Sequence, residues 1–164
     1  MSSEQSIPSP VALNHVGVGV ADIDAAIAWY CEILGARLVS GPFEIADDAQ
    51  AEDVLGSRFR RMLLAHLSLA NGVGIELFQS IDPPHQRRRD SIDFWKSGFF
   101  HICVTHPDVE GLAERIASTG GKRLSRIWKE RGDAKDYRMC YCRDPFGNII
   151  EIYSHSYELM QAHR

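Results

Sequence analysis

Two histidines and two glutamates recur at matching places in the two halves of this 164-residue chain. His15 and His101 open alternating apolar segments, and Glu76 and Glu151 each lie between two aliphatic residues. Imidazole nitrogens and carboxylate oxygens suit first-row divalent ions such as Ni, Co, Zn, Mn or Fe. A carboxylate pair inside a concave apolar site is costly unless a cation neutralises it. The four residues therefore predict a site for one divalent metal ion, whose identity the donors leave open.

The four residues occupy equivalent positions of an internal repeat. Segment 13–24 aligns with segment 99–110, so that His15 falls on His101 and Asp22 falls on Asp108. A run of apolar residues at helical spacing follows in both halves, and a glycine ends each run. The expected stripes are Ile23, Ile27, Cys31 and Leu34, closed by Gly35, and Val109, Leu112, Ala113 and Ile116, closed by Gly120.

Each half then ends in a strand hairpin. The first hairpin turns at Asn71-Gly72, a dipeptide typical of tight turns between strands. The second turns within 143–148, where Pro145 and Gly147 supply turn residues. The chain is thus predicted to be an α+β protein of two βαβββ modules.

One domain is expected, because a domain usually has roughly 100–200 residues. The predicted parts are a disordered tail (1–10), a first module (11–79) with an inserted helix within 46–58, a linker (80–98), a second module (99–157) and a C-terminal tail (158–164).

Alternation along the strands assigns the chemistry to one face. Val16, Val18 and Val20, and in the second half Phe100, Ile102 and Val104, are expected to point to the helix layer. The two histidines and the two glutamates then point the other way. We expect the modules to form a curved mixed sheet around a cavity that receives all four side chains.

Composition excludes several classes of function. Lys and Arg number 18 against 22 Asp and Glu, and this net charge of −4 argues against a nucleic-acid binder. The apolar runs fall far short of the roughly 20 residues that a membrane helix needs, and the start of the chain lacks the pattern of a signal peptide. Cys140 and Cys142 are expected to be buried core thiols. A cytoplasmic protein with a small-molecule substrate, and no nucleic-acid or membrane partner, is expected.

Over roughly Val11 to Tyr157 the chain resembles the vicinal oxygen chelate superfamily, the glyoxalase/bleomycin-resistance/dioxygenase fold. The most specific motif is Asp144-Pro-Phe-Gly-Asn-Ile-Ile-Glu151, and Leu13-Asn-His-Val-Gly-Val supports it. The resemblance implies that the metal ligands are His15, Glu76, His101 and Glu151. That full set is most similar to glyoxalase I (lactoylglutathione lyase) of the bacterial type. Methylmalonyl-CoA epimerases are similar but carry an amide where Glu76 stands, and the insert within 46–58 resembles valiolone-type cyclitol epimerases.

The resemblance implies a metal-dependent lyase/isomerase or epimerase. Such an enzyme chelates vicinal oxygens of a small α-oxygenated carbonyl substrate, and a glutamate moves a proton through an enediolate. Glu151 and Glu76 are the catalytic candidates, with Glu151 preferred as the base. The alternatives are an extradiol-type ring-cleaving dioxygenase and a non-catalytic binding or resistance protein of the same fold.

Three further residues share strand faces with the glutamates and are candidates for lining the substrate cavity. They are Phe78, Tyr153 and His155. A homodimer is expected, because an open curved sheet leaves edges that pairing would cover. The repeat allows two arrangements of the site: the halves of one chain close around it, or half of each chain meets its partner.

Overall fold

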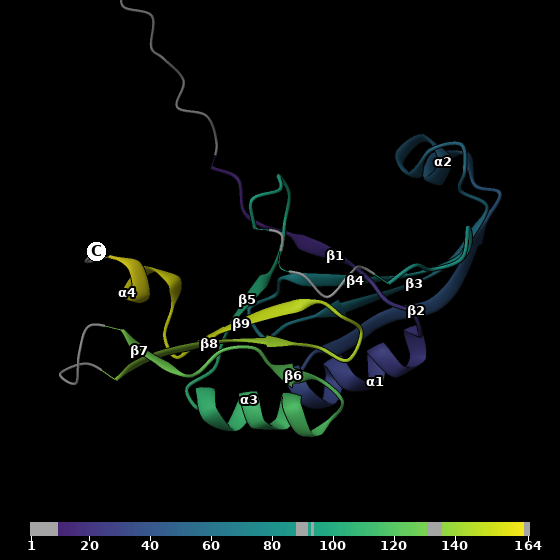
Figure 1. The fold of residues 1–164 in the computed structure, drawn as a ribbon. Helices are drawn as coiled ribbons and strands as arrows, with labels where there is room; N and C mark the ends of the chain where they lie inside the picture. The colour runs from purple at the N-terminus through teal and green to yellow at the C-terminus, as the bar shows by residue number, and fades with distance from the viewer. Residues whose placement is uncertain (1–9, 88–91, 93, 131–135, 163–164) are drawn as a thin grey trace, which may run out of the picture.

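The computed structural model describes residues 10–87, 92, 94–130 and 136–162 (Figure 1). The expected disordered tail lies almost wholly outside this part of the chain. The first half contains β1 (His15–Gly19), α1 (Ile23–Leu34), β2 (Arg37–Ala46), α2 (Ala49–Leu55), β3 (Arg61–Ser68) and β4 (Gly74–Asp82). The second half contains β5 (Ile102–Thr105), α3 (Val109–Ser118), β6 (Lys122–Arg123), β7 (Trp128–Glu130), β8 (Tyr137–Arg143), β9 (Ile149–Tyr153) and α4 (Tyr157–Gln161).

The described strands pair into two mixed sheets, one in each half. The first has the order β1-β4-β3-β2, and the second has the order β5-β9-β8-β6 with β7 also on β8. In both sheets the first strand runs parallel to the last one, while the hairpin strands are antiparallel. The α+β class and the repeated strand–helix–strands order are therefore confirmed, with two sheets in place of one and an added short strand in the second half.

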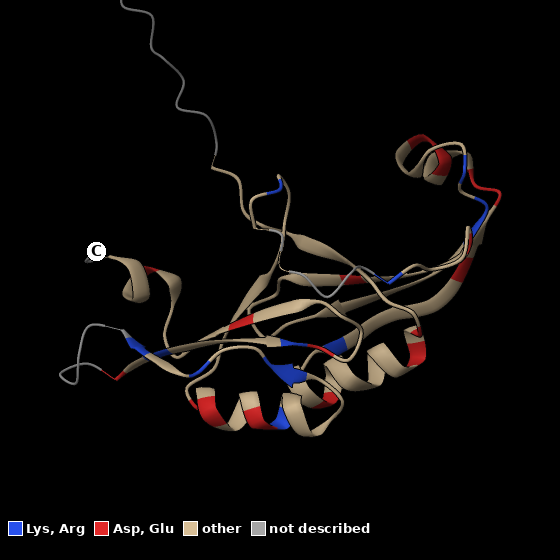
Figure 2. Ribbon diagram, viewed as in Figure 1, with Lys and Arg blue, Asp and Glu red and all other residues tan. Residues whose placement is uncertain are grey.

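Both long helices begin at an aspartate that the repeat places at equivalent positions. The carboxylate of Asp22 accepts a hydrogen bond from Ala25 N at 3.0 Å, and that of Asp108 accepts one from Gly111 N at 2.9 Å. Figure 2 shows acidic residues at the starting ends of α1 and α3, where the helix dipole favours negative charge. The first helix ends at Gly35, whose φ of 67° is readily adopted by glycine.

α1 and α3 lie on the same side of the sheets (Figure 1), and the core fills the space between the helices and the sheets. The stripe expected on α3 is confirmed, because all four of its residues are buried. The stripe expected on α1 is confirmed in part: Ile23 is buried, whereas Ile27, Cys31 and Leu34 are partly buried and pack against the core. A step of four residues turns about 40° past a full helical turn, so that series drifts off the core-facing side. The buried face consists of Ile23, Ala26, Trp29, Tyr30 and Ile33.

Several boundaries also differ from those expected. β4 continues to Asp82, inside the segment expected to be a linker. Residues 157–161 form α4 in place of part of a tail, and its Met160 is buried. Phe100 precedes β5 and is exposed, so the alternation assigned to it does not apply. The inserted helix is present as α2, and Cys140 and Cys142 are fully buried in the core.

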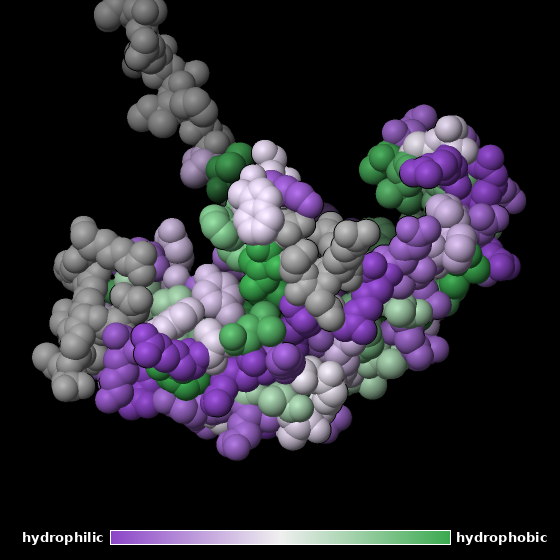
Figure 3. Space-filling model, in the orientation of Figure 1, coloured by the Kyte–Doolittle hydropathy of each residue, from purple (hydrophilic) through white to green (hydrophobic). Residues whose placement is uncertain are grey.

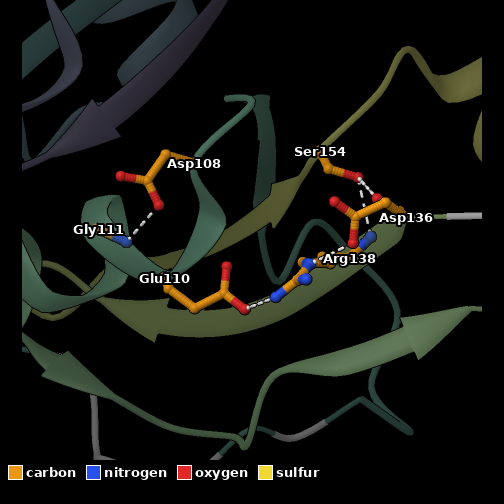
Figure 4. Close-up of polar contacts among 6 residues, drawn as sticks. All are labelled: Asp108, Glu110, Gly111, Asp136, Arg138 and Ser154. Atoms are coloured by element: carbon orange, nitrogen blue, oxygen red, sulfur yellow. Dashed lines mark hydrogen bonds and ion pairs between the residues drawn. The ribbon is translucent and has the colours of Figure 1, made fainter. Parts of the chain in front are cut away.

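A charged cluster joins the start of α3 to β8 (Figure 4). The Arg138 guanidinium contacts Glu110 of α3 and also donates to Asp136 Oδ1 at 2.6 Å. Ser154 Oγ accepts a hydrogen bond from the Arg138 backbone N–H at 2.8 Å. These contacts fix the start of α3 against β8, the strand next to β9, which carries Glu151.

A buried hydrogen bond ties the two halves together. Tyr30 of α1 donates its hydroxyl to Asp144 Oδ2 at 2.7 Å, and both side chains are at most 1% exposed. The Asp144 carboxylate also accepts hydrogen bonds from Phe146 N and Asn148 N, which shape the turn before β9. Because Glu151 follows this turn directly, Tyr30 helps to hold the second half in place.

Tyr30→Phe should lower the free energy of unfolding by about 1.5–3 kcal/mol, the usual worth of a hydrogen bond to a charged group. Burial, followed by the neighbouring Asp144 carboxylate, raises the pKa of Tyr30 well above its ordinary value of about 10. This contribution is therefore fully present below about pH 10 and is lost as the pH rises further, because only the unfolded chain then releases the proton. Urea unfolding of both proteins between pH 7 and pH 11 measures the difference. If the difference in the free energy of unfolding between the wild type and Tyr30→Phe grew above pH 10, that result would contradict this role.

Candidate metal centre

The structure places the histidines and glutamates on the sheet faces that are turned away from the helices. In β1 and β4, Val18, Ile75 and Leu77 are buried against the helices, whereas His15 and Glu76 face outward. In β9, the aliphatic neighbours of Glu151 belong to the core cluster between helices and sheets. The face assignments made from alternation therefore agree with the structure for these strands.

His15 and Glu76 form the first pair. His15 Nε2 lies 3.4 Å from Glu76 Oε2, and its Nδ1 lies 2.8 Å from Asn14 Oδ1. The amide oxygen of Asn14 can accept a hydrogen bond from Nδ1, while Nε2 faces the Glu76 carboxylate. A histidine that binds a metal through one ring nitrogen is commonly held by a protein group at the other, and Asn14 holds Nδ1 in this way. The pair borders an open cavity of about 350 Å³.

His66 is a further residue of this pair that the sequence analysis missed. It lies on β3 directly across from Glu76, and its Nε2 is 3.3 Å from Glu76 Oε1. Its Nδ1 contacts Ser40 Oγ on β2 at 2.9 Å. The side chains of Ser40, His66 and Glu76 thus form a line across three adjacent strands.

His101 and Glu151 form the second pair. His101 Nε2 lies 3.2 Å from Glu151 Oε2, and Glu151 is only 4% exposed. The imidazole contacts the rings of Phe100 and Tyr141 edge-on, and its buried Nδ1 has no hydrogen-bond partner among the described residues. Aromatic packing therefore orients this histidine, whereas a hydrogen bond orients His15.

Tyr141 and Cys103 are the other neighbours of Glu151, and neither was singled out from the sequence. Tyr141 lies directly across on β8, and Cys103 lies across on β5. Desolvation, followed by the Glu151 carboxylate, raises the pKa of both groups. At neutral pH both keep their protons, so Tyr141 acts as a donor to Glu151 and Cys103 is a poor nucleophile.

Within one chain the two pairs do not meet. Among the described residues, no group of three or more His, Cys, Asp or Glu side chains is arranged to hold a metal ion. The residues that line the cavity beside His15 and Glu76 all come from the first half. The arrangement in which the halves of one chain close around a single site is therefore not the one observed.

Each pair nevertheless has the spacing of two ligands of one ion. Donor atoms bound at about 2.1 Å, with about 90–110° between them, lie about 3.0–3.4 Å apart. The two Nε2–Oε2 distances, 3.4 Å and 3.2 Å, fall within this range. The contact of His15 Nδ1 with Asn14 Oδ1 is consistent with such a role, because it leaves Nε2 turned toward Glu76. Each pair thus fits one half of a divalent metal site.

The three residues expected to line the substrate cavity have different surroundings. The Phe78 ring packs over Gly17, beside Glu76, and borders a second cavity of about 240 Å³ under the end of α2. Tyr153 is buried beneath α4, and its hydroxyl accepts a hydrogen bond from Gln161. His155 lies beyond the end of β9 against the Tyr137 ring. Phe78 thus lines a cavity, although not the one that His15 and Glu76 border.

Comparison with known proteins defines the class. Residues 12–152 match the model of the Glyoxalase/Bleomycin resistance protein/Dioxygenase superfamily, and the chain belongs to this family. It is 29% identical to a 2-epi-5-epi-valiolone epimerase of Actinomyces sp. over 90% of this chain and 81% of that protein. It is 26% identical to a lactoylglutathione lyase of Pseudomonas putida over 85% of this chain and 82% of that protein.

The fold also matches a glyoxalase family protein of Bacillus cereus, with a TM-score of 0.73 and 21% identity, over 90% of this chain and 97% of that one. None of the described helices is long and apolar enough to cross a membrane.

Proposed function

We propose that the protein is a metal-dependent enzyme that moves a proton at the carbon beside a carbonyl group of a small oxygenated substrate. The observation that carries this proposal is the repeated His–Glu pair, with ligand-like spacing in each half. The family relatives are named as an epimerase and a lyase, and both kinds of reaction exchange a proton next to a carbonyl. The protein is accordingly an epimerase or a glyoxalase-like isomerase.

The complete site forms between two copies of the chain. The first pair of one copy meets the second pair of its partner, which supplies His15, Glu76, His101 and Glu151 around one ion. Exposed apolar residues favour such an interface, including Val11, Leu13, Phe94, Trp95 and Phe99. Figure 3 shows apolar residues at the surface beside the start of the described chain and on α2. A homodimer with two identical sites follows from this arrangement.

A divalent ion held by this set would polarise the carbonyl oxygen of the substrate and acidify the neighbouring C–H. The chain's own residues then handle the proton. Glu151 is the proposed base that accepts it at a carboxylate oxygen, because its burial keeps competing water away. Glu76 comes from the other half of the repeat, so it approaches the substrate from a different side.

Epimerisation is the outcome that the proposed arrangement of the two glutamates favours. Two carboxylates on opposite sides allow one to remove a proton and the other to return one to the opposite face of the same carbon. The relative with 29% identity is named an epimerase, which supports this choice. Isomerisation, as in the lyase relative, would need only one of the two carboxylates.

The proposal predicts metal-dependent exchange of a substrate proton with solvent. The metal-free and Mn²⁺-, Co²⁺-, Ni²⁺- or Zn²⁺-loaded proteins are incubated in D₂O with 2-epi-5-epi-valiolone and, separately, with S-lactoylglutathione. Deuterium entering one carbon beside the carbonyl, seen by NMR only in the loaded protein, supports the proposal. Purified protein that binds none of these ions would rule it out. Oxygen uptake with catechols by the Fe²⁺-loaded protein would favour a dioxygenase.

A further inference from the structure

Each carboxylate of the two pairs faces a potential hydrogen-bond donor on the neighbouring antiparallel strand. His66 on β3 is paired with Glu76 on β4, and Tyr141 on β8 is paired with Glu151 on β9. Side chains directly across such strands have their Cβ atoms about 4.5–5.5 Å apart, close enough for direct contact. The two halves thus place chemically different donors at the same position of the repeat.

A carboxylate oxygen only accepts, so a hydrogen bond from His66 to Glu76 requires the ring hydrogen on Nε2. Ser40 Oγ lies 2.9 Å from His66 Nδ1, and a serine hydroxyl can donate its proton to that nitrogen. His66 Nε2 then carries the ring hydrogen and points to Glu76 Oε1, 3.3 Å away. The other oxygen, Oε2, is the one that lies beside His15 Nε2. The two carboxylate oxygens therefore have separate neighbours.

We propose that His66 is a positioning residue, held by Ser40, that engages Glu76 Oε1 and thereby presents Glu76 Oε2 to the metal together with His15. This inference rests on the proposed function and adds to it a residue outside the four ligands. Protein groups that orient a ligand in this way commonly change metal affinity by about 10–100-fold when they are removed. Tyr141 is the counterpart of His66 in the second half, directly across from Glu151.

The test compares three His66 and Ser40 variants by their affinity for Co²⁺, measured by visible absorption in competition with a chelator. His66→Leu removes the donor at similar volume, and we expect its affinity to fall about 10–100-fold. His66→Gln places an amide N–H near the position of Nε2, and its affinity should stay within about fivefold of the wild type. Ser40→Ala leaves the ring but frees its proton to sit on either nitrogen, so an intermediate loss is expected.

His106→Leu is the matched control, because it removes a histidine that contacts Asp108 at the start of α3, away from both pairs. Its Co²⁺ affinity should equal that of the wild type. Circular dichroism of each variant identifies any that fails to fold. A wild-type protein that binds no Co²⁺ would overturn the proposed function itself.

Two results would overturn the proposed role of His66 and leave the proposed function intact. One is wild-type affinity in His66→Leu. The other is an equal loss in His66→Leu and His66→Gln, which would make His66 a direct ligand. With substrate, a positioning role predicts that His66→Gln restores most of the kcat that His66→Leu loses, at nearly constant KM.

Discussion

Replacing Glu151 by glutamine should reduce turnover by about 10²–10⁴-fold, the usual contribution of a general base. The amide has nearly the same shape and can still accept a hydrogen bond from Tyr141, so the fold should persist. His15, Glu76 and His101 remain available to the ion, and we expect part of the metal affinity to survive. The loss therefore reflects the missing proton acceptor more than a missing ion.

The measurement pairs steady-state turnover with metal content for Glu151→Gln and Glu76→Gln. If each glutamate serves one face of the substrate, each variant should still exchange deuterium into one epimer while interconversion of the two epimers is lost. If the protein isomerises, only one of the glutamates should matter for exchange. Near-wild-type turnover by metal-loaded Glu151→Gln would remove the base assignment.

Much of the fold could be predicted because the sequence signals are local. The capping aspartates, the α3 stripe and the strand alternation each depend on spacings of two to four residues, which sequence displays directly. The stripe expected on α1 was only partly right for a related reason. Its buried face is determined by how the helix packs between the sheet and α3, and Ala26 and Tyr30 are as well spaced for that face as Ile27 and Cys31.

The residues across from the glutamates could not be predicted, because they depend on strand register. A two-residue turn at Asn71-Gly72 would pair His66 with Leu77. His66 would then point to the face of the sheet that packs against the helices, away from Glu76. In the structure Leu69 N donates to Val73 O, and Gly72 has a φ of 84°, so the loop has one more residue. Such three-residue loops with a terminal glycine are common in hairpins. This single extra residue brings His66 opposite Glu76.

The separation of the two pairs depends on a still longer-range property, namely how the halves pack. Both halves bury their helix-facing sides in one shared core, fixed by the Tyr30–Asp144 hydrogen bond. The sequence repeat alone is compatible with a site formed by the two halves of one chain and with a site formed between two chains. Because this packing leaves His15–Glu76 and His101–Glu151 apart within a chain, the proposed four-ligand site requires a second copy.

Two variants that each lack one pair should therefore complement each other when mixed. One carries His15→Ala and Glu76→Ala, and the other carries His101→Ala and Glu151→Ala. Neither alone can build a complete site, and each should lose almost all bound Co²⁺ and turnover. In a mixed dimer the intact first pair of one chain meets the intact second pair of the other, which restores one of two sites.

Equal mixing with full subunit exchange gives about half mixed dimers, so about one quarter of the wild-type metal content and activity should return. Light scattering establishes that each variant and the mixture are dimers, and brief mild urea treatment allows the subunits to exchange. The matched control mixes His15→Ala/Glu76→Ala with itself under the same treatment, where nothing should return. If the four ligands acted within one chain, the mixture would stay as inactive as its parts, since every chain then lacks two ligands of its own site.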